Sequence, residues 1–150
     1  MADKEVVFVV EDEFLVRESI VRELEDAGFG VMTAECGDEA LDILSKLPRI
    51  DILLTDIRMP GHINGWTLAD MARRQSPKLP VIYMSGFCPD QGMEVEGSLF
   101  LAKPYRADEL MRAIEKLLCR EKNITGLALP KVTIRFQLAV LPQAWQPIAR

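Results

Sequence analysis

The stretch Ile50-Asp51-Ile52-Leu53-Leu54-Thr55-Asp56 decides the fold, because its apolar residues are consecutive and it ends on a carboxylate. A run without a polar face is typical of a strand that is covered on both sides, as in a parallel sheet between two layers of helices. Pro48 and Pro60 bracket the stretch, and the Pro and Gly that follow it favour a turn. Asp56 is therefore predicted at the carboxyl end of a buried strand, the edge of an α/β sheet at which ligands bind.

The rest of the chain alternates between strand and helix patterns. Four further segments read as strands, and they are residues 6–10, 29–34, 81–85 and 98–102. Four segments carry a helical pattern, and they are residues 14–27, 37–46, 66–75 and 106–118. Pro89, Gly92 and Gly97 interrupt residues 87–97, so we expect at most one or two helical turns there. The order predicts an α/β fold: a five-stranded parallel sheet with helices on both faces and a shortened fourth helix.

Composition limits the classes of function. The chain has 150 residues, 49% hydrophobic and 27% charged, which is typical of one soluble domain. Its net charge is −5, and residues 120–150 hold five Lys or Arg against one Glu, so the acidic charge lies on the part before them. An acidic body argues against a nucleic-acid surface. Three widely spaced cysteines and the lack of a signal peptide or membrane-spanning run lead us to expect a cytoplasmic protein.

Residues of related chemistry follow four of the five predicted strands: Glu11, Asp12, Asp56, Ser85 and Lys103. Taken singly, each of these residues could be a helix cap, a turn residue or a loop lysine. Because the carboxyl ends of parallel strands meet at one edge, however, we expect the residues to lie close together. Three crowded carboxylates favour a hard divalent cation such as Mg²⁺. A lysine and a hydroxyl that face the same acid indicate a phosphoryl group, which an Asp nucleophile can accept as an acyl phosphate.

These residues lie in motifs that identify a family. The chain resembles the receiver domain of two-component response regulators, a flavodoxin-like, CheY-like module, in its single-domain type. The resemblance covers about residues 4–119. The matching motifs, in chain order, are Val9-Val10-Glu11-Asp12-Glu13, Leu54-Thr55-Asp56-Ile57-Arg58-Met59-Pro60-Gly61, Met84-Ser85-Gly86 and Lys103-Pro104.

The resemblance implies a role for each matching residue. Asp56 would accept the phosphoryl group from a phosphohistidine of a sensor histidine kinase or a phosphotransfer protein. Mg²⁺ would be bound by the carboxylates of Asp12 and Asp56 and by the main-chain carbonyl of Arg58, and Glu11 would act through water. Lys103 would pair with the phosphoryl oxygens.

The same resemblance implies a switch that transmits the signal. Ser85 would move to bind the attached phosphoryl group, Phe100 would turn inward, and the altered surface would reach an unknown downstream protein. Such a protein catalyses only its own phosphotransfer, so we do not classify it as an enzyme. Two alternatives are a phosphorylation-independent adaptor with a receiver fold and a Mg²⁺-dependent phosphohydrolase. The hydrolase is disfavoured because such enzymes typically carry a second acid where this chain has Arg58.

Residues 120–150 are a C-terminal extension, too short for the DNA-binding domains usually attached to receivers, so we expect no direct contact with nucleic acid and none with a membrane. Residues 132–140 alternate between apolar and other side chains, which predicts a half-buried strand. This strand could dock on the receiver domain, pair between two chains or stay poorly ordered. We favour pairing, and thus a homodimer through the extension.

Overall fold

The computed structural model describes residues 3–46, 49–86, 93–124 and 145–147. Its strands are β1 (Val6–Val10), β2 (Gly30–Ala34), β3 (Ile52–Asp56), β4 (Val81–Ser85), β5 (Leu99–Ala102) and β6 (Trp145–Pro147). Its helices are α1 (Phe14–Asp26), α2 (Gly37–Lys46), α3 (Gly65–Gln75) and α4 (Ala107–Ile124).

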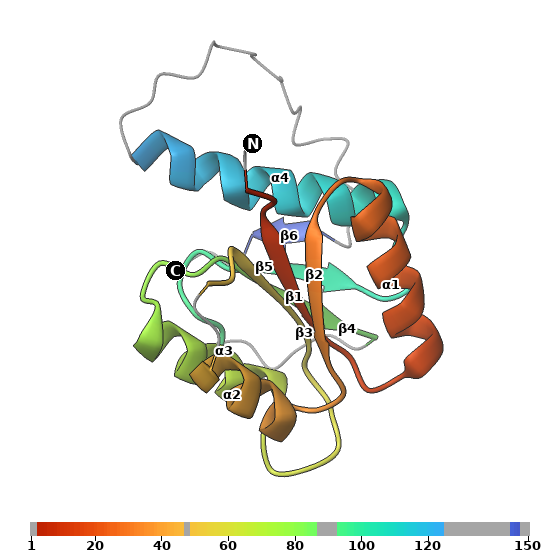
Figure 1. Ribbon diagram of the computed structural model, residues 1–150, viewed down its shortest axis with the longest axis vertical. Coiled ribbons are helices and arrows are strands. Elements are labelled where there is room, and N and C mark those ends of the chain that lie inside the picture. Colours follow the sequence, from red (N-terminus) through yellow and green to blue (C-terminus); the bar gives the residue numbers. More distant parts are fainter. Residues whose placement is uncertain (1–2, 47–48, 87–92, 125–144, 148–150) are drawn as a thin grey trace.

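All strands form one sheet in the order β2-β1-β3-β4-β5-β6, and the first five are parallel (Figure 1). The predicted five-stranded parallel sheet is therefore confirmed. The register places Val10 beside Thr55, and Asp56 beside Met84. The carboxyl ends of β1, β3 and β4 thus finish at one level, which is what a shared site at this edge requires.

Helices cover both faces of the sheet, with α1 and α4 on one side and α2 and α3 on the other (Figure 1). The central strand β3 contributes side chains to the apolar clusters on both faces of the sheet. Ile52 and Leu54 belong to the apolar cluster that includes α1 and α4, whereas Leu53 belongs to the cluster that includes α2 and α3. All three side chains are fully buried. This two-sided burial explains why the deciding stretch has no polar alternation.

The connection from β4 to β5 contains no helix among its described residues 93–98, which form turns. Residues 87–92 of the same connection, on which the rest of the predicted short helix falls, lie outside the described residues. The segment is anchored by hydrogen bonds. The Arg73 guanidinium donates to the carbonyl of Glu96 (2.8 Å), and the Val95 N–H donates to the Tyr83 hydroxyl (3.2 Å).

Two features of the C-terminal part differ from the sequence prediction. Helix α4 continues to Ile124 rather than ending at residue 118. The three described residues of the extension beyond it form β6, which pairs antiparallel with β5 of the same chain. The predicted strand 132–140 lies outside the described residues. In the described ranges, no helix combines the length and apolar character that crossing a membrane requires.

Candidate functional site

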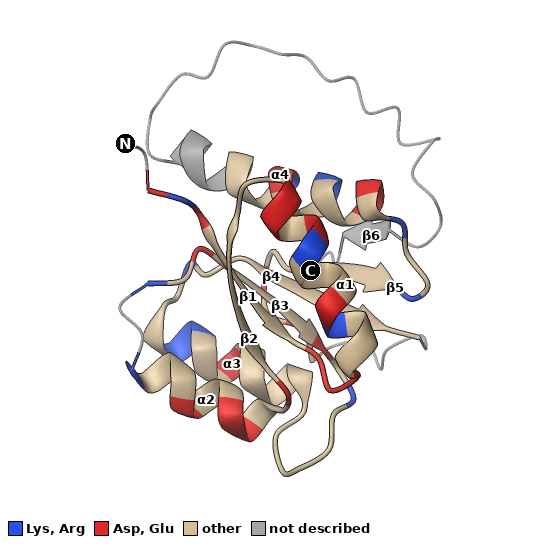
Figure 2. Ribbon diagram, turned by 45° about the vertical axis from the view of Figure 1, so that its right-hand side comes forward, with Lys and Arg blue, Asp and Glu red and all other residues tan. Residues whose placement is uncertain are grey.

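Two adjacent strands bring three carboxylates to the carboxyl edge of the sheet. Glu11 and Asp12 follow β1, and Asp56 is the last residue of β3. Figure 2 shows acidic residues in red where β1 runs into α1. One ligand oxygen from each of the three residues lies within 4.8 Å of the others. Glu11 is fully buried and Asp56 is 8% exposed, whereas Asp12 is open to solvent.

Lys103 forms ion pairs with two of these acids at the same edge of the sheet. It follows β5, and its Nζ donates to Glu11 Oε2 (2.6 Å) and to Asp56 Oδ2 (2.9 Å). Its main-chain N–H also donates to the carbonyl of Ser85 at 2.8 Å, which ties the end of β5 to the end of β4. Carboxylates at the ends of two strands, β1 and β3, therefore converge on the ammonium group of Lys103.

Burial and charge act in opposite directions on the ionisable groups here. Burial raises the pKa of Glu11 above its ordinary value, and the hydrogen bond and positive charge of Lys103 only partly oppose that effect. Burial by itself would lower the pKa of Lys103, but its hydrogen bonds to Asp56 and Glu11 outweigh burial and raise that pKa. Lys103 is therefore a cation at neutral pH.

The loop after β3 holds the Asp56 side chain and the main chain of Ile57. The Arg58 N–H donates to Asp56 Oδ1 (3.3 Å), and the Gly65 N–H donates to the carbonyl of Ile57 (2.8 Å). A Cβ on Gly65 would collide with the main-chain carbonyl of Asp56. The first residue of α3 must therefore be glycine for the helix to approach the site so closely. Sequence reasoning missed Gly65, although a glycine directly before a helical pattern was a visible signal.

Arg17 is the second residue that sequence reasoning missed. Helical periodicity places it outside the apolar stripe of α1, yet it is only 6% exposed. Its Nη1 donates to the main-chain carbonyl of Glu11 (2.7 Å), and its Nη2 donates to Glu35 Oε1 (3.0 Å). Periodicity cannot reveal such a residue, because the partners of the guanidinium lie at the ends of two strands.

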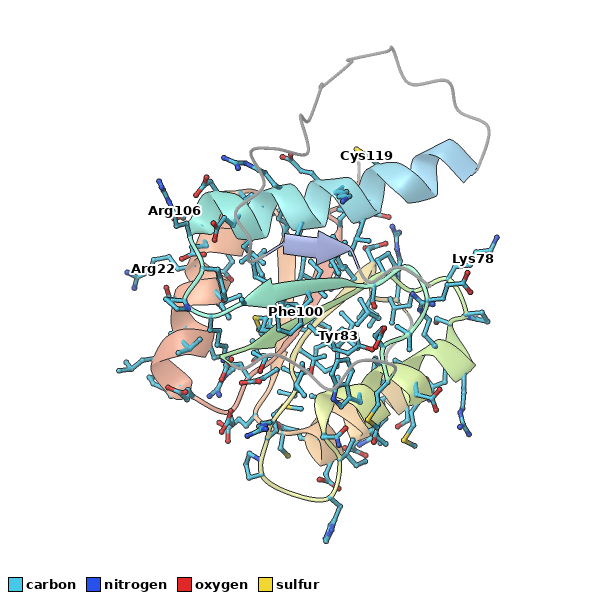
Figure 3. All side chains as sticks on the ribbon, turned by 180° about the vertical axis from the view of Figure 1, so that it is seen from behind. Arg22, Lys78, Tyr83, Phe100, Arg106 and Cys119 are labelled. Carbon is cyan, nitrogen blue, oxygen red and sulfur yellow. The ribbon has the colours of Figure 1, made fainter. Side chains whose placement is uncertain are left out.

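The remaining predicted residues lie near the edge or one step away from it. Ser85 ends β4 and is almost fully buried. Arg58 is exposed and lies two residues after Asp56. Phe100 is partly buried in the α2/α3 cluster, at the position of β5 that lies opposite Tyr83 of β4 (Figure 3). The structure thus brings Glu11, Asp12, Asp56 and Lys103 together and places Phe100 on a face of the sheet.

The donor set suits a hard divalent ion. Three carboxylates offer oxygen ligands only, one of them on an exposed side chain that can turn toward an ion. Oxygen donors of this kind are those that Mg²⁺ prefers, with its other positions left to water or phosphate oxygens. The site thus combines the exposed carboxylate of Asp12 with two buried carboxylates, and the Lys103 cation bridges these two. Such a set of groups can bind a metal and a phosphoryl group side by side.

Among the known proteins with similar sequences or folds are bacterial regulators. A probable transcriptional regulatory protein of Picosynechococcus sp. is 30% identical over 146 residues, which cover 90% of this chain and 57% of that protein. The crystal structure of a response regulator receiver protein from Sinorhizobium medicae has a TM-score of 0.71 and 28% identity, and covers 78% of this chain and 96% of that one.

A second solved structure, the response regulator TrrA of Thermotoga maritima in complex with Mg²⁺ and BeF, has a TM-score of 0.69 and 29% identity. It covers 76% of this chain and 99% of that one. The present chain spans about half of the length, or less, of the curated relatives it matches.

The family model for the response regulator receiver domain matches residues 7–115, a range that includes Glu11, Asp12, Asp56, Ser85 and Lys103. The match covers more than half of the chain and agrees with the topology and with the acids at the carboxyl edge of the sheet. The chain belongs to the response regulator receiver domain family.

Proposed function

We propose that this chain is the phosphoacceptor of a two-component signalling system and that Asp56 receives the phosphoryl group. The observation that carries the proposal is the convergence of Glu11, Asp12 and Asp56 at one edge, with Lys103 bonded to two of them. Receiver domains are signalling phosphoacceptors rather than enzymes that turn over an external substrate, and this chain would catalyse only its own phosphotransfer.

The chemistry assigned to the site is an in-line displacement at phosphorus. A carboxylate oxygen of Asp56 attacks the phosphorus of a phosphohistidine, so that a P–O bond forms as the P–N bond breaks. The electron pair of the broken bond stays on the imidazole nitrogen, which takes up a proton. Lys103 already contacts Asp56 Oδ2, so its ammonium is close enough to pair with the phosphoryl oxygens after transfer.

The metal ligands that we propose are the carboxylates of Asp12 and Asp56 and the main-chain carbonyl of Arg58. When bound there, Mg²⁺ would neutralise negative charge on the incoming phosphoryl oxygens. Glu11 would act through water. This indirect role is supported by its carboxylate oxygens, which already accept hydrogen bonds from the Glu13 N–H and from Lys103.

Signalling is proposed to start at Ser85 and Phe100. A phosphoryl group on Asp56 gives Ser85 a new acceptor, and contacts made only in the phosphorylated state favour a different arrangement of β4 and β5. Ser85 and Phe100 lie on these two neighbouring strands, and the ends of the strands are joined by the bond from Lys103 N–H to the Ser85 carbonyl. Phe100 would then change its exposure on the α2/α3 face.

The partners that we propose are a sensor histidine kinase or phosphotransfer protein upstream and an unidentified protein downstream. The likeness to the receiver domain of the hybrid histidine kinase CckA, 35% identical with a TM-score of 0.66, supports this assignment. We propose residues 4–119 as the receiver domain and 120–150 as an extension that contributes to a homodimer.

Mass spectrometry after incubation with acetyl phosphate and Mg²⁺ tests the function. We expect one labile phosphoryl adduct on the full chain, lost in Asp56→Ala and after chelation of the metal. Asp42→Ala, which removes an exposed carboxylate of α2, is the matched control and should keep the adduct. No adduct on the wild type would favour the adaptor, and steady phosphate release from unrelated phosphoesters would favour the hydrolase.

A further inference from the structure

We propose that Arg17 is a positioning residue for the metal site, because its guanidinium holds the peptide group that joins Glu11 to Asp12. The inference rests on the proposed function, since it concerns the affinity of that site for Mg²⁺. Arg17 itself would touch neither the metal nor the phosphoryl group. It acts through the main chain that presents Asp12.

The contact with that peptide is short and buried. Arg17 Nη1 lies 2.7 Å from the main-chain oxygen of Glu11, and the side chain is almost completely covered. This oxygen and the N–H of Asp12 belong to the same rigid peptide plane. Fixing the oxygen therefore fixes the direction in which the chain leaves β1 and enters Asp12. A hydrogen bond from a charged donor is about twice as strong as a neutral one, which suits this task.

The other side of the guanidinium is anchored to the neighbouring strand. Nη2 pairs with Glu35 Oε1 at 3.0 Å, and the Glu35 N–H donates to Glu39 Oε2 at 2.7 Å, which connects this residue to α2. The Phe14 ring lies 5.6 Å from the guanidinium carbon. Arg17 is thus held by the Glu35 carboxylate and the Phe14 ring while it binds the Glu11 carbonyl, so it can act as a fixed support.

Stability by itself does not account for this arrangement. The Glu35 side chain is 72% exposed, and ion pairs with an exposed partner contribute little to the free energy of unfolding. Burying a guanidinium also costs desolvation energy. The hydrogen bond from Arg17 to the Glu11 carbonyl would explain why the charge is buried, because that peptide group leads into Asp12, a proposed metal ligand. Groups that orient metal ligands typically change metal affinity by about 10- to 100-fold when they are removed.

Titration of the full chain with Mg²⁺, followed by calorimetry and by the amide resonances of Asp12 and Glu13, tests the inference. Arg17→Met keeps most of the apolar volume but cannot donate, and we expect its Mg²⁺ dissociation constant to rise about tenfold. Arg17→Lys should recover part of the affinity, since an ammonium can reach one acceptor but not both. Arg22→Met is the control, because Arg22 lies on the same helix and points away from the sheet (Figure 3).

The outcomes separate the inference from the proposed function. A wild-type Mg²⁺ affinity in folded Arg17→Met, with only a lower melting temperature, would show a purely structural role and overturn the inference. If Arg17→Met does not fold, Arg17→Gln replaces it, with the same criterion. Absence of Mg²⁺ binding by the wild-type chain would overturn the metal site itself, whereas unchanged affinity in the variants would overturn only the role of Arg17.

Discussion

Lys103 shows how one side chain decides the electrostatics of the site. It places a single positive charge between the fully buried Glu11 and the nearly buried Asp56. Three acids without this cation would repel one another, and a buried carboxylate without a partner carries the full cost of its desolvation. The lysine therefore offsets the repulsion between these acids in the absence of metal.

Replacing Lys103 by Met should lower the free energy of unfolding by about 2 kcal/mol, because two crowded acids lose their shared cation. Mg²⁺ should stabilise this variant more than the wild type, since the ion restores positive charge at the same place. Urea unfolding with and without Mg²⁺ measures both effects. Lys46→Met removes an exposed lysine that pairs with Asp42, and it should change stability little. Equal losses in the two variants would contradict the prediction.

Tyr83 gives the fold a dependence on alkaline pH. Burial raises its pKa to about 12, and the hydrogen bond from the Val95 N–H and the charge of Arg73 only partly oppose this. An unfolded tyrosine titrates near about pH 10. The stability that comes from the neutral phenol is therefore complete below about pH 10 and is lost as the pH rises toward 12.

We accordingly expect the wild type to lose about 1 kcal/mol more stability than Tyr83→Phe between about pH 9 and 11, since each unit of pKa difference corresponds to about 1.4 kcal/mol. The variant also leaves the Val95 N–H without its hydroxyl acceptor, which adds a cost that does not depend on pH. Urea unfolding at several pH values separates the two effects. Stability curves that stay parallel over this range would contradict the assignment.

Single residues such as Asp56 and Lys103 could be predicted from the sequence, because each is charged and lies at the carboxyl end of a predicted strand. Prediction from the sequence fails where a side chain works against its local pattern. Arg17 has the charge of a surface residue and the spacing of one, yet its guanidinium is buried against main-chain and side-chain acceptors. Gly65 was missed because the need for glycine arises from the Asp56 main chain, nine positions earlier in the sequence.

Among the elements, the first turn of α3 sets the position of the β3 carboxyl end. Asn64 accepts a hydrogen bond from the Thr67 N–H and begins the helix, and Gly65 then lies against the main chain of Asp56. The helix can therefore pack against the end of β3 this closely only if its first residue lacks a side chain. This contact connects helix geometry directly to the site.

Gly65→Ala should lower the free energy of unfolding by about 1–3 kcal/mol, because its Cβ meets main-chain atoms that cannot move aside easily. The forced shift of Asp56 should also slow phosphorylation by acetyl phosphate. Gly86→Ala is the control beside the same edge, since a Cβ there has no described atom within 4 Å. Thermal unfolding and the rate of adduct formation measure the two effects. Similar behaviour of the two variants would refute this role for α3.

Elements with a complete local signal were predicted well. The five apolar strands and the helices between them follow from consecutive apolar runs and from 3.6-residue spacing, and the parallel sheet confirms them. The short strand β6 was missed because Pro147 and the nearby Pro142 were interpreted as residues that interrupt a strand. An edge strand tolerates proline, since one side of it needs no hydrogen-bond donor, and sequence alone does not say which strand is at the edge.

For the whole molecule, β6 determines which strand is last in the sheet. It lies outside β5, the strand that leads to Lys103, and it pairs Leu99 with Pro147 and Leu101 with Trp145. Without β6, the outer main-chain groups of β5 would be an open edge, which is a site for pairing with other chains. β6, a segment of the same chain, therefore covers this edge of β5, the strand next to the site.

A chain truncated after Ile124 keeps α4 and loses β6, so its β5 amides should exchange with solvent faster than in the full chain. The amides of β1, which lies between β2 and β3, are the internal control and should be unchanged. Hydrogen exchange measures this effect, and light scattering on both chains tests the homodimer. Pairing through the extension predicts twice the chain mass for the full protein and the single mass after truncation. Equal β5 exchange in the two chains would show that β6 does not protect this edge in solution, since only a strand that stays paired slows the exchange of its neighbour.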